Sequence, residues 1–144
     1  RIDCDNLLKL LHNAAKGIIT TYRERKKIYI NPCAMPATFD PNWGSQDTWS
    51  CVTGNAQLEF FLRRLSHFVA DTSLTEVADQ IMNDLKQIHL IDGVHDTNLY
   101  GGIQGSVPIE APYAIYSIPN WGVKFFADSL LQRLLPFDKI PYLS

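Results

Sequence analysis

Five carboxylates lie in two irregular, proline- and glycine-containing stretches of this sequence, residues 29–50 and 91–119: Asp40, Asp47, Asp92, Asp96 and Glu110. A glycoside hydrolase needs two carboxylates that flank the scissile bond, one of them kept protonated by apolar surroundings. Asp47 lies between Trp43 and Trp49. Glu110 lies near Tyr113, so Asp47 and Glu110 are the candidate acid and base groups. The alternative role for each is a loop carboxylate that accepts hydrogen bonds from backbone N–H groups.

His95 is the one histidine in these irregular stretches, and it is the candidate for a different base. Polysaccharide lyases use a His or Tyr base to abstract a proton beside a uronate, and they neutralise the acid group. His95 is followed by Asp96 and Tyr100, which supplies the residue types for this chemistry. In either reaction Lys124 would neutralise an anionic group of the ligand.

Aromatic and amide side chains in the same regions have the chemistry of a sugar site. Sugars stack on aromatic faces and are held by hydrogen bonds from amides and charged groups. The candidates are Trp43, Trp49, Asn55, Gln57, Tyr113, Tyr116, Asn120, Trp121 and Lys124. Asn55 and Asn120 have a competing role as helix N-caps.

Other site chemistries are disfavoured by the spacing of the residues. The segment GGIQGSVPI (101–109) lacks the G-x-G-x-x-G order of a dinucleotide loop, and no P-loop lysine follows it. Its glycines are expected to let the backbone turn or approach another segment closely. Cys33, Cys51 and His95 lack zinc spacing, and there is no G-x-S-x-G motif. We therefore expect neither a cofactor nor a metal.

Four helices are predicted to position these residues, over 5–27, 55–70, 74–89 and 120–135, because apolar residues recur at helical spacing there. Asp3 or Asp5 is expected to cap the first helix, and Ser73 with Glu76 has the pattern of a capping box. No clear strand pattern stands out, although KIYI and YAIYSI could pair locally. The class is all-α.

The connections between these helices are long, short and long, which places both long loops at one end of an antiparallel stack. Loops of this length are usually functional. The segments NAQLEFFLRRL (55–65) and NWGVKFFADSL (120–130) also align without gaps, which is typical of repeated helical hairpins. Both helices would then direct their N-termini toward the loops, where an anionic or polyhydroxylated ligand is favoured.

Three segments resemble a family of bacterial α/α-toroid proteins: CVTGNAQLEFFLRRL (51–65), GGIQGSVPI (101–109) and IPNWGVKFFADSLL (118–131). That family shares a six-hairpin scaffold with squalene-cyclase-like and glycosidase-like proteins and is linked to surface-polysaccharide pathways. The resemblance implies site positions at Asp47, Cys51, Thr53, Gly54, Asn55, Gln57, Gly101, Gly102, Gly105, Ser106, Pro108, Pro119, Asn120, Trp121 and Lys124. The aspartate-rich and Gln-Trp motifs of isoprenoid cyclases are absent, which disfavours terpene cyclisation.

Length and composition set the remaining expectations. The 144 residues fit one helical domain, 1–144, and supply only part of a six-hairpin toroid, so we expect a piece of a larger protein that begins here at Arg1. A net charge of −2 gives no reason to propose nucleic acid as a partner. No apolar run is long enough to span a membrane. The three cysteines favour reduced thiols and a cytoplasmic location, while a single Cys33–Cys51 bridge stays open.

The predicted function is carbohydrate-directed: binding or processing of a glycan, neutral or acidic, in polysaccharide metabolism. An enzyme of this kind would be a glycoside hydrolase or a polysaccharide lyase. The alternative is a non-catalytic helical module that packs against the rest of its parent protein, another subunit or a second copy.

Overall fold

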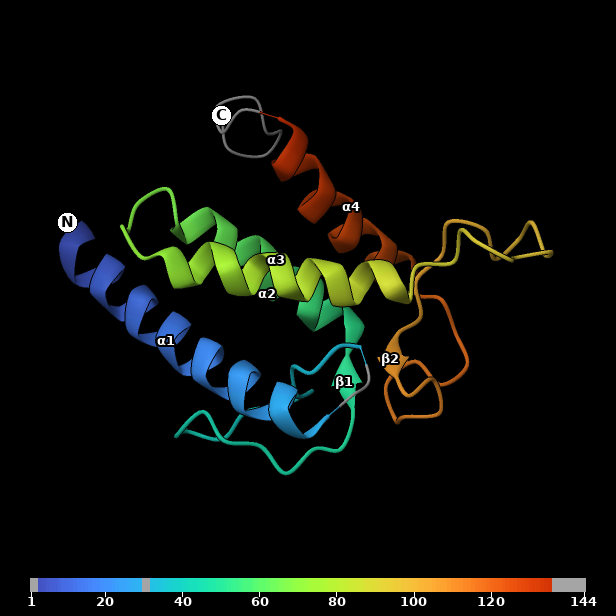
Figure 1. The fold of residues 1–144 in the computed structure, drawn as a ribbon, viewed down its shortest axis with the longest axis horizontal. Coiled ribbons are helices and arrows are strands. Elements are labelled where there is room, and N and C mark those ends of the chain that lie inside the picture. The colour runs from blue at the N-terminus through green and yellow to red at the C-terminus, as the bar shows by residue number, and fades with distance from the viewer. Residues whose placement is uncertain (1–2, 30–31, 136–144) are drawn as a thin grey trace.

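The computed structural model describes residues 3–29 and 32–135. Within them the chain forms four helices and two very short strands, shown in Figure 1: α1 (Cys4–Ile28), β1 (Ser50–Cys51), α2 (Val52–Leu65), α3 (Thr72–Gln87), β2 (Ser106–Val107) and α4 (Asn120–Leu134). The predicted all-α class is therefore confirmed apart from the small sheet. The α/α-toroid assignment stays a prediction.

The antiparallel α2–α3 hairpin lies between the other two helices, with α1 on one side and α4 on the other (Figure 1). Helices α2 and α4 run side by side in the same direction. The Ser129 hydroxyl of α4 donates to the Ala56 carbonyl of α2 at 2.8 Å. Farther along both helices, the Gln132 amide donates to Glu59 at 3.0 Å. The N-termini of α2 and α4 thus lie at the same end, as the aligned segments predict.

The two long connections meet at this end through the sheet. Strand β1 pairs antiparallel with β2, with Ser50 opposite Val107 and Cys51 opposite Ser106. The ladder continues for one more bond, from Val52 N–H to the Gly105 carbonyl at 3.0 Å. The structure therefore agrees with the prediction that both long loops share one end of the helices.

The suggested pairing of KIYI with YAIYSI is wrong. Residues 113–118 form turns rather than a strand. In the first segment, Lys27 and Ile28 belong to the last turn of α1, and Ile30 lies outside the described residues. The observed strands have two residues each, which is too short for an alternating pattern to appear in the sequence.

One contiguous apolar core fills the space between the helices. Each helix contributes residues three and four positions apart, which lie on one face of a helix. In α1 these are Ala15, Ile18, Ile19 and Tyr22, and in α3 they are Leu74, Val77, Ala78, Ile81, Met82 and Leu85. All three cysteines are free thiols, so the Cys33–Cys51 bridge is not formed.

Helix α2 differs from the predicted range of 55–70 at both ends. It begins three residues earlier, because Cys51 is the N-cap and its Sγ accepts the Gly54 N–H at 3.4 Å. It ends at Leu65. The Ser66 hydroxyl donates a hydrogen bond to the Arg63 carbonyl at 2.7 Å, and a tighter turn follows. Phe68 falls within the predicted range but beyond the observed end of the helix, and it is 58% exposed.

The predicted caps are right for α1 and wrong elsewhere. Asp3 caps α1 by accepting from the backbone N–H groups of its second and third residues, both at 3.2 Å. Asp71, and not the Ser73–Glu76 pair, caps α3. Neither Asn55 nor Asn120 is an N-cap: each lies inside its helix, after Cys51 and Pro119 respectively.

Asp71 joins two helices and gives the fold a specific acid sensitivity. Its carboxylate accepts from His12 of α1 at 2.8 Å and from the Ser73 hydroxyl and N–H at 2.6 and 3.0 Å. The hydrogen bonds from His12 and Ser73 lower the pKa of Asp71 to about 2. Because the unfolded-state pKa is near 3.9, this carboxylate stabilises the fold above about pH 4. Its contribution is lost as the pH falls toward 2.

We therefore expect an Asp71→Asn variant to lose stability less steeply than the wild type between about pH 4 and pH 2. Asparagine is an equally good N-cap through its amide oxygen, so the α3 cap is kept, whereas the charge and the oxygen that faces His12 are removed. Urea midpoints measured across this pH range test the prediction. Parallel acid profiles for the two proteins would show that Asp71 is not the group responsible.

Candidate functional site

The three predicted catalytic groups have different settings. The Asp47 carboxylate accepts the backbone N–H and the hydroxyl of Thr38, both at 2.7 Å, so it fastens its own loop. Glu110 lies exposed in the turn after β2, and His95 lies exposed in the 91–100 segment. Neither carboxylate is buried, in contrast to the apolar setting expected of a glycosidase acid. The catalytic roles of all three residues stay predictions.

A turn in the first long loop places Trp43 against α1. The Asp40 carboxylate accepts the N–H groups of Asn42 and Gly44 at 2.7 and 2.8 Å, and Trp43 adopts a left-handed conformation with φ of 66°. The indole ring then lies directly on Gly17, where a Cβ atom would come within 2.3 Å of the Trp43 ring. Glycine at position 17 is therefore what lets this aromatic ring reach the helix.

A cleft of about 480 Å³ lies beside this contact, between α1 and the 42–45 turn. Its size is within the usual range of small-molecule sites. Besides the Trp43 indole, its lining includes a cation, a carboxylate, a hydroxyl and an amide, which are Lys16, Glu24, Thr20 and Asn42. Arg25 also lines the cleft, but it donates to the Ala34 and Asp47 carbonyls and stacks on Tyr29.

The other predicted residues of the first region are placed by packing and backbone contacts. The Trp49 carbonyl accepts from Ala37 N–H at 3.2 Å. Asn55 is buried and its amide donates to the Cys51 carbonyl at 2.7 Å, which ties β1 to the first turn of α2. Gln57 is exposed on α2.

The structure brings together several predicted residues of the second region at the start of α4. The Trp121 ring nitrogen donates to the Tyr113 hydroxyl at 2.5 Å, so the loop holds this half-exposed indole in place. Asn120 is exposed at the first position of the helix. Lys124, one turn later, pairs with Asp128 and lies over the Phe125 ring at 4.5 Å.

Gly102 and Ser106 are buried and hold the second loop together. A Cβ atom at Gly102 would meet Ile118 at 2.8 Å, and the Ser106 hydroxyl donates to the Tyr113 carbonyl at 2.8 Å. The glycines of this segment thus have the role predicted for them: Gly101 has a positive φ of 80°, and Gly105 allows a close approach to Ala114.

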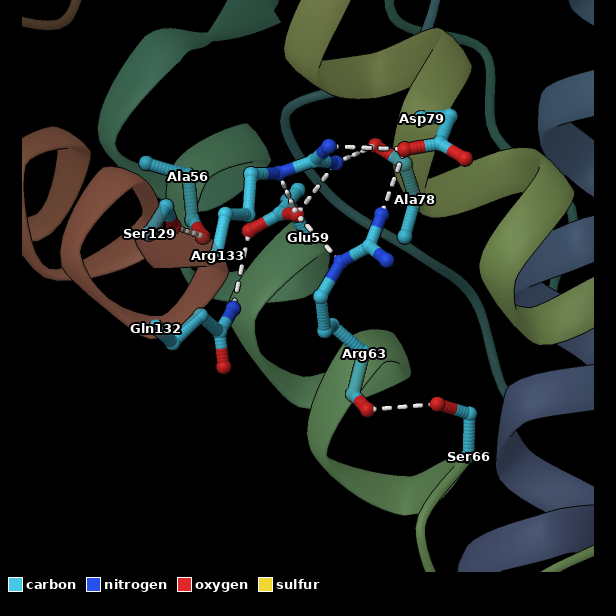
Figure 2. A network of polar contacts seen from close by, with 9 residues as sticks. All are labelled: Ala56, Glu59, Arg63, Ser66, Ala78, Asp79, Ser129, Gln132 and Arg133. Carbon is cyan, nitrogen blue, oxygen red and sulfur yellow. Dashed lines mark hydrogen bonds and ion pairs between the residues drawn. The ribbon is translucent and has the colours of Figure 1, made fainter. Parts of the chain in front are cut away.

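An extensive polar network joins α2, α3 and α4, and the sequence did not predict it (Figure 2). Glu59 of α2 is fully buried. It accepts from Arg133 Nε and Nη2 at 2.9 and 2.7 Å, from Arg63 Nε at 3.3 Å and from Gln132 at 3.0 Å. Asp79 of α3 accepts from the same two arginines at 2.5 and 2.7 Å. Burial opposes the ionisation of Asp79, but Arg133 and Arg63 outweigh it and lower its pKa.

A second feature is an apolar groove of about 390 Å³ where the N-terminal half of α1 meets the end of α2. Its apolar lining is Leu7, Leu8, Leu11, Phe61, Leu65 and Phe68. Such a surface is what a helical interaction module would need. That alternative hypothesis stays a prediction.

No family model, curated protein or solved structure matches this chain. Within the described ranges, no helix combines the length and the apolar character needed to cross a membrane. No group of three or more His, Cys, Asp or Glu side chains in that part of the chain is placed to hold a metal ion.

Two signals in the sequence point to the residues that were missed. Gly17 interrupts an otherwise regular helical pattern, and such a glycine often has a packing reason. Glu59 and Arg63 are four residues apart on a predicted helix, which indicates an ion pair. The partners Trp43 and Arg133 come from distant parts of the chain, and no local pattern indicates them.

Proposed function

We propose that this chain binds a glycan in the Trp43 cleft. The observation that carries the proposal is the combination, in one concave site, of an immobilised indole with polar groups from a second element. Gly17 fixes the indole on the helix. An aromatic face suits the apolar face of a sugar ring, and amide, hydroxyl and charged groups suit its hydroxyls.

The lining also favours a particular charge for the ligand. Lys16, Glu24 and Arg25 line the same cleft, and Glu24 is also paired with Lys27. The ionisable lining therefore has a small excess of positive charge, which suits a neutral sugar or one with a single acidic group in contact with Lys16. The proposal is for binding, because the Asp47 carboxylate is engaged by Thr38 and does not line the cleft.

The test is a glycan array followed by titration calorimetry with the best ligand found. We expect Trp43→Ala to weaken binding about tenfold or more, which corresponds to roughly 1.4 kcal/mol of lost stacking and burial. Because Trp43 also packs on Gly17, Asn42→Ala is the second variant: it leaves that packing intact and should weaken binding as well.

Trp121→Ala is the matched control, since it removes an exposed tryptophan outside the cleft. It should leave the affinity unchanged. If Trp121→Ala abolishes binding while Trp43→Ala and Asn42→Ala do not, the site lies at α4 and the Trp43 proposal is wrong. An array on which no glycan binds would remove the proposal altogether.

A further inference from the structure

A third cavity, of about 470 Å³, opens beside the polar network of α2, α3 and α4. Its ionisable lining is entirely basic: Arg63, His67 and Arg133. The remaining lining consists of Ser66, Thr75, Gln132 and Leu135. No carboxylate lines this cavity, although two carboxylates bind its arginines.

Those two carboxylates fix the arginine side chains in position. Glu59 and Asp79 each accept from both guanidinium groups, so Arg63 and Arg133 lie side by side at defined positions (Figure 2). Holding long side chains in place before a ligand arrives reduces the entropy that binding would otherwise cost. The two arginines are therefore preorganised.

The arginines also have N–H groups left over. A guanidinium carries five N–H donors. Among the described residues, Arg63 donates through Nε and Nη2 only, to Glu59 and Asp79, so its Nη1 group is available. Arg133 donates through Nε and Nη2 to Glu59 and through Nη1 to Asp79. These bonds hold its side chain more firmly but leave fewer N–H groups for a ligand. Arg63 is thus the main donor that the site can offer.

This donor set fits an oxyanion. Guanidinium groups bind phosphate and carboxylate oxygens through paired, charge-assisted hydrogen bonds. A carboxylate matches one guanidinium fork, whereas a tetrahedral phosphate can bridge two guanidinium groups from different helices. The cavity is also in the size range of sites for small molecules rather than for a bare ion.

We propose that this cavity, at Arg63 and Arg133, binds the phosphate group of a small phosphorylated molecule. Glu59 and Asp79 act as positioning residues, because they orient the two guanidinium groups. The local charges of the four residues cancel, so binding depends on directed N–H bonds. The site shares no residue with the Trp43 cleft, and the two proposals can succeed or fail independently.

The test uses inorganic phosphate, glucose 6-phosphate and glucuronate as probes in titration calorimetry, with the wild type and with Trp43→Ala, in which sugar binding at the Trp43 cleft is weakened and does not mask the Arg63 site. We expect glucose 6-phosphate to bind more tightly than inorganic phosphate, and glucuronate to bind most weakly. Arg63→Gln should reduce the affinity for glucose 6-phosphate about tenfold or more. Binding of glucuronate as tight as that of glucose 6-phosphate would contradict the phosphate preference.

Because Arg63 also belongs to a structural network, a second variant leaves that network unchanged. Thr75→Glu adds a negative charge to the lining of the cavity, in the first turn of α3. The helix dipole favours acidic side chains at that end of a helix, so the variant should fold. It should abolish phosphate binding. Thr72→Glu adds the same charge to the same turn outside the lining and should bind as the wild type does. Equal binding by both variants, or no binding of either phosphate probe to the wild type, would overturn the proposal.

Discussion

Replacing Glu59 with alanine is expected to lower the free energy of unfolding by about 3–5 kcal/mol, the usual cost of removing one partner from a buried ion pair. Glu59 is fully buried, and it accepts hydrogen bonds from Arg63, Gln132 and Arg133. Alanine leaves these donors without their acceptor and opens a space among three helices. Urea denaturation at pH 7 measures the loss.

The control is Glu76→Ala, which removes an ion pair in which both side chains are about half exposed. Exposed pairs contribute under about 1 kcal/mol, so this variant should stay close to the wild type. The Arg133→Ala variant adds a further test. Since Glu59 and Arg133 are in direct contact, the double variant should lose less stability than the sum of the two single variants. Additive losses would show that the pair does not couple α2 to α4.

The long, regular helices are the part of the fold that the sequence predicts best. The observed bounds of α1 and α4 lie within one residue of the predicted ranges, because both have a sustained apolar period and clear polar ends. The ends of α2 and the start of α3 were less predictable. A cysteine cap, such as Cys51, is not among the usual N-cap residues, and the Asp71 cap competed with a plausible capping-box pattern.

The candidate sites were predictable only in part, because each depends on contacts between distant residues. Trp43 was a candidate from its type alone, but its position depends on the Asp40 turn and on the absence of a side chain at Gly17. Arg133 reaches Glu59 across 74 residues of sequence. Such contacts follow from the packing of α4 on α2, which no local pattern specifies.

For the loop carboxylates, the sequence pattern suggests a catalytic role that their contacts in the structure do not require. Asp47 has the residue type and the aromatic neighbours of a catalytic acid. In the structure it accepts two hydrogen bonds from Thr38, and such bonds stabilise a short loop segment by satisfying its backbone. The sequence pattern for the two roles is the same. Only the position of the carboxylate relative to a cleft separates them.

Replacing Tyr22 with phenylalanine is the other change with a large expected effect, a loss of about 1.5–3 kcal/mol at pH 7. Tyr22 is fully buried, and its hydroxyl donates to Asp84 Oδ2 at 2.8 Å. The other oxygen of Asp84 accepts from Lys26 at 2.5 Å. Phenylalanine fills the same space but leaves a buried carboxylate oxygen without its donor. Tyr100→Phe, at an exposed position, is the matched control and should change little.

The pH dependence of this variant tests whether the fold holds the proton of the buried Tyr22 hydroxyl. Burial, together with the charge of Asp84, raises the pKa of Tyr22 above its ordinary value of about 10. Since the folded state holds this proton more tightly, the contribution of Tyr22 is fully present below about pH 10 and is lost as the pH rises further. Burial also raises the pKa of the Cys33 thiol, so stability begins to fall near pH 8.5 in both the wild type and Tyr22→Phe. Urea midpoints above pH 10 should therefore fall more steeply for the wild type than for Tyr22→Phe, and equal slopes would contradict the assignment.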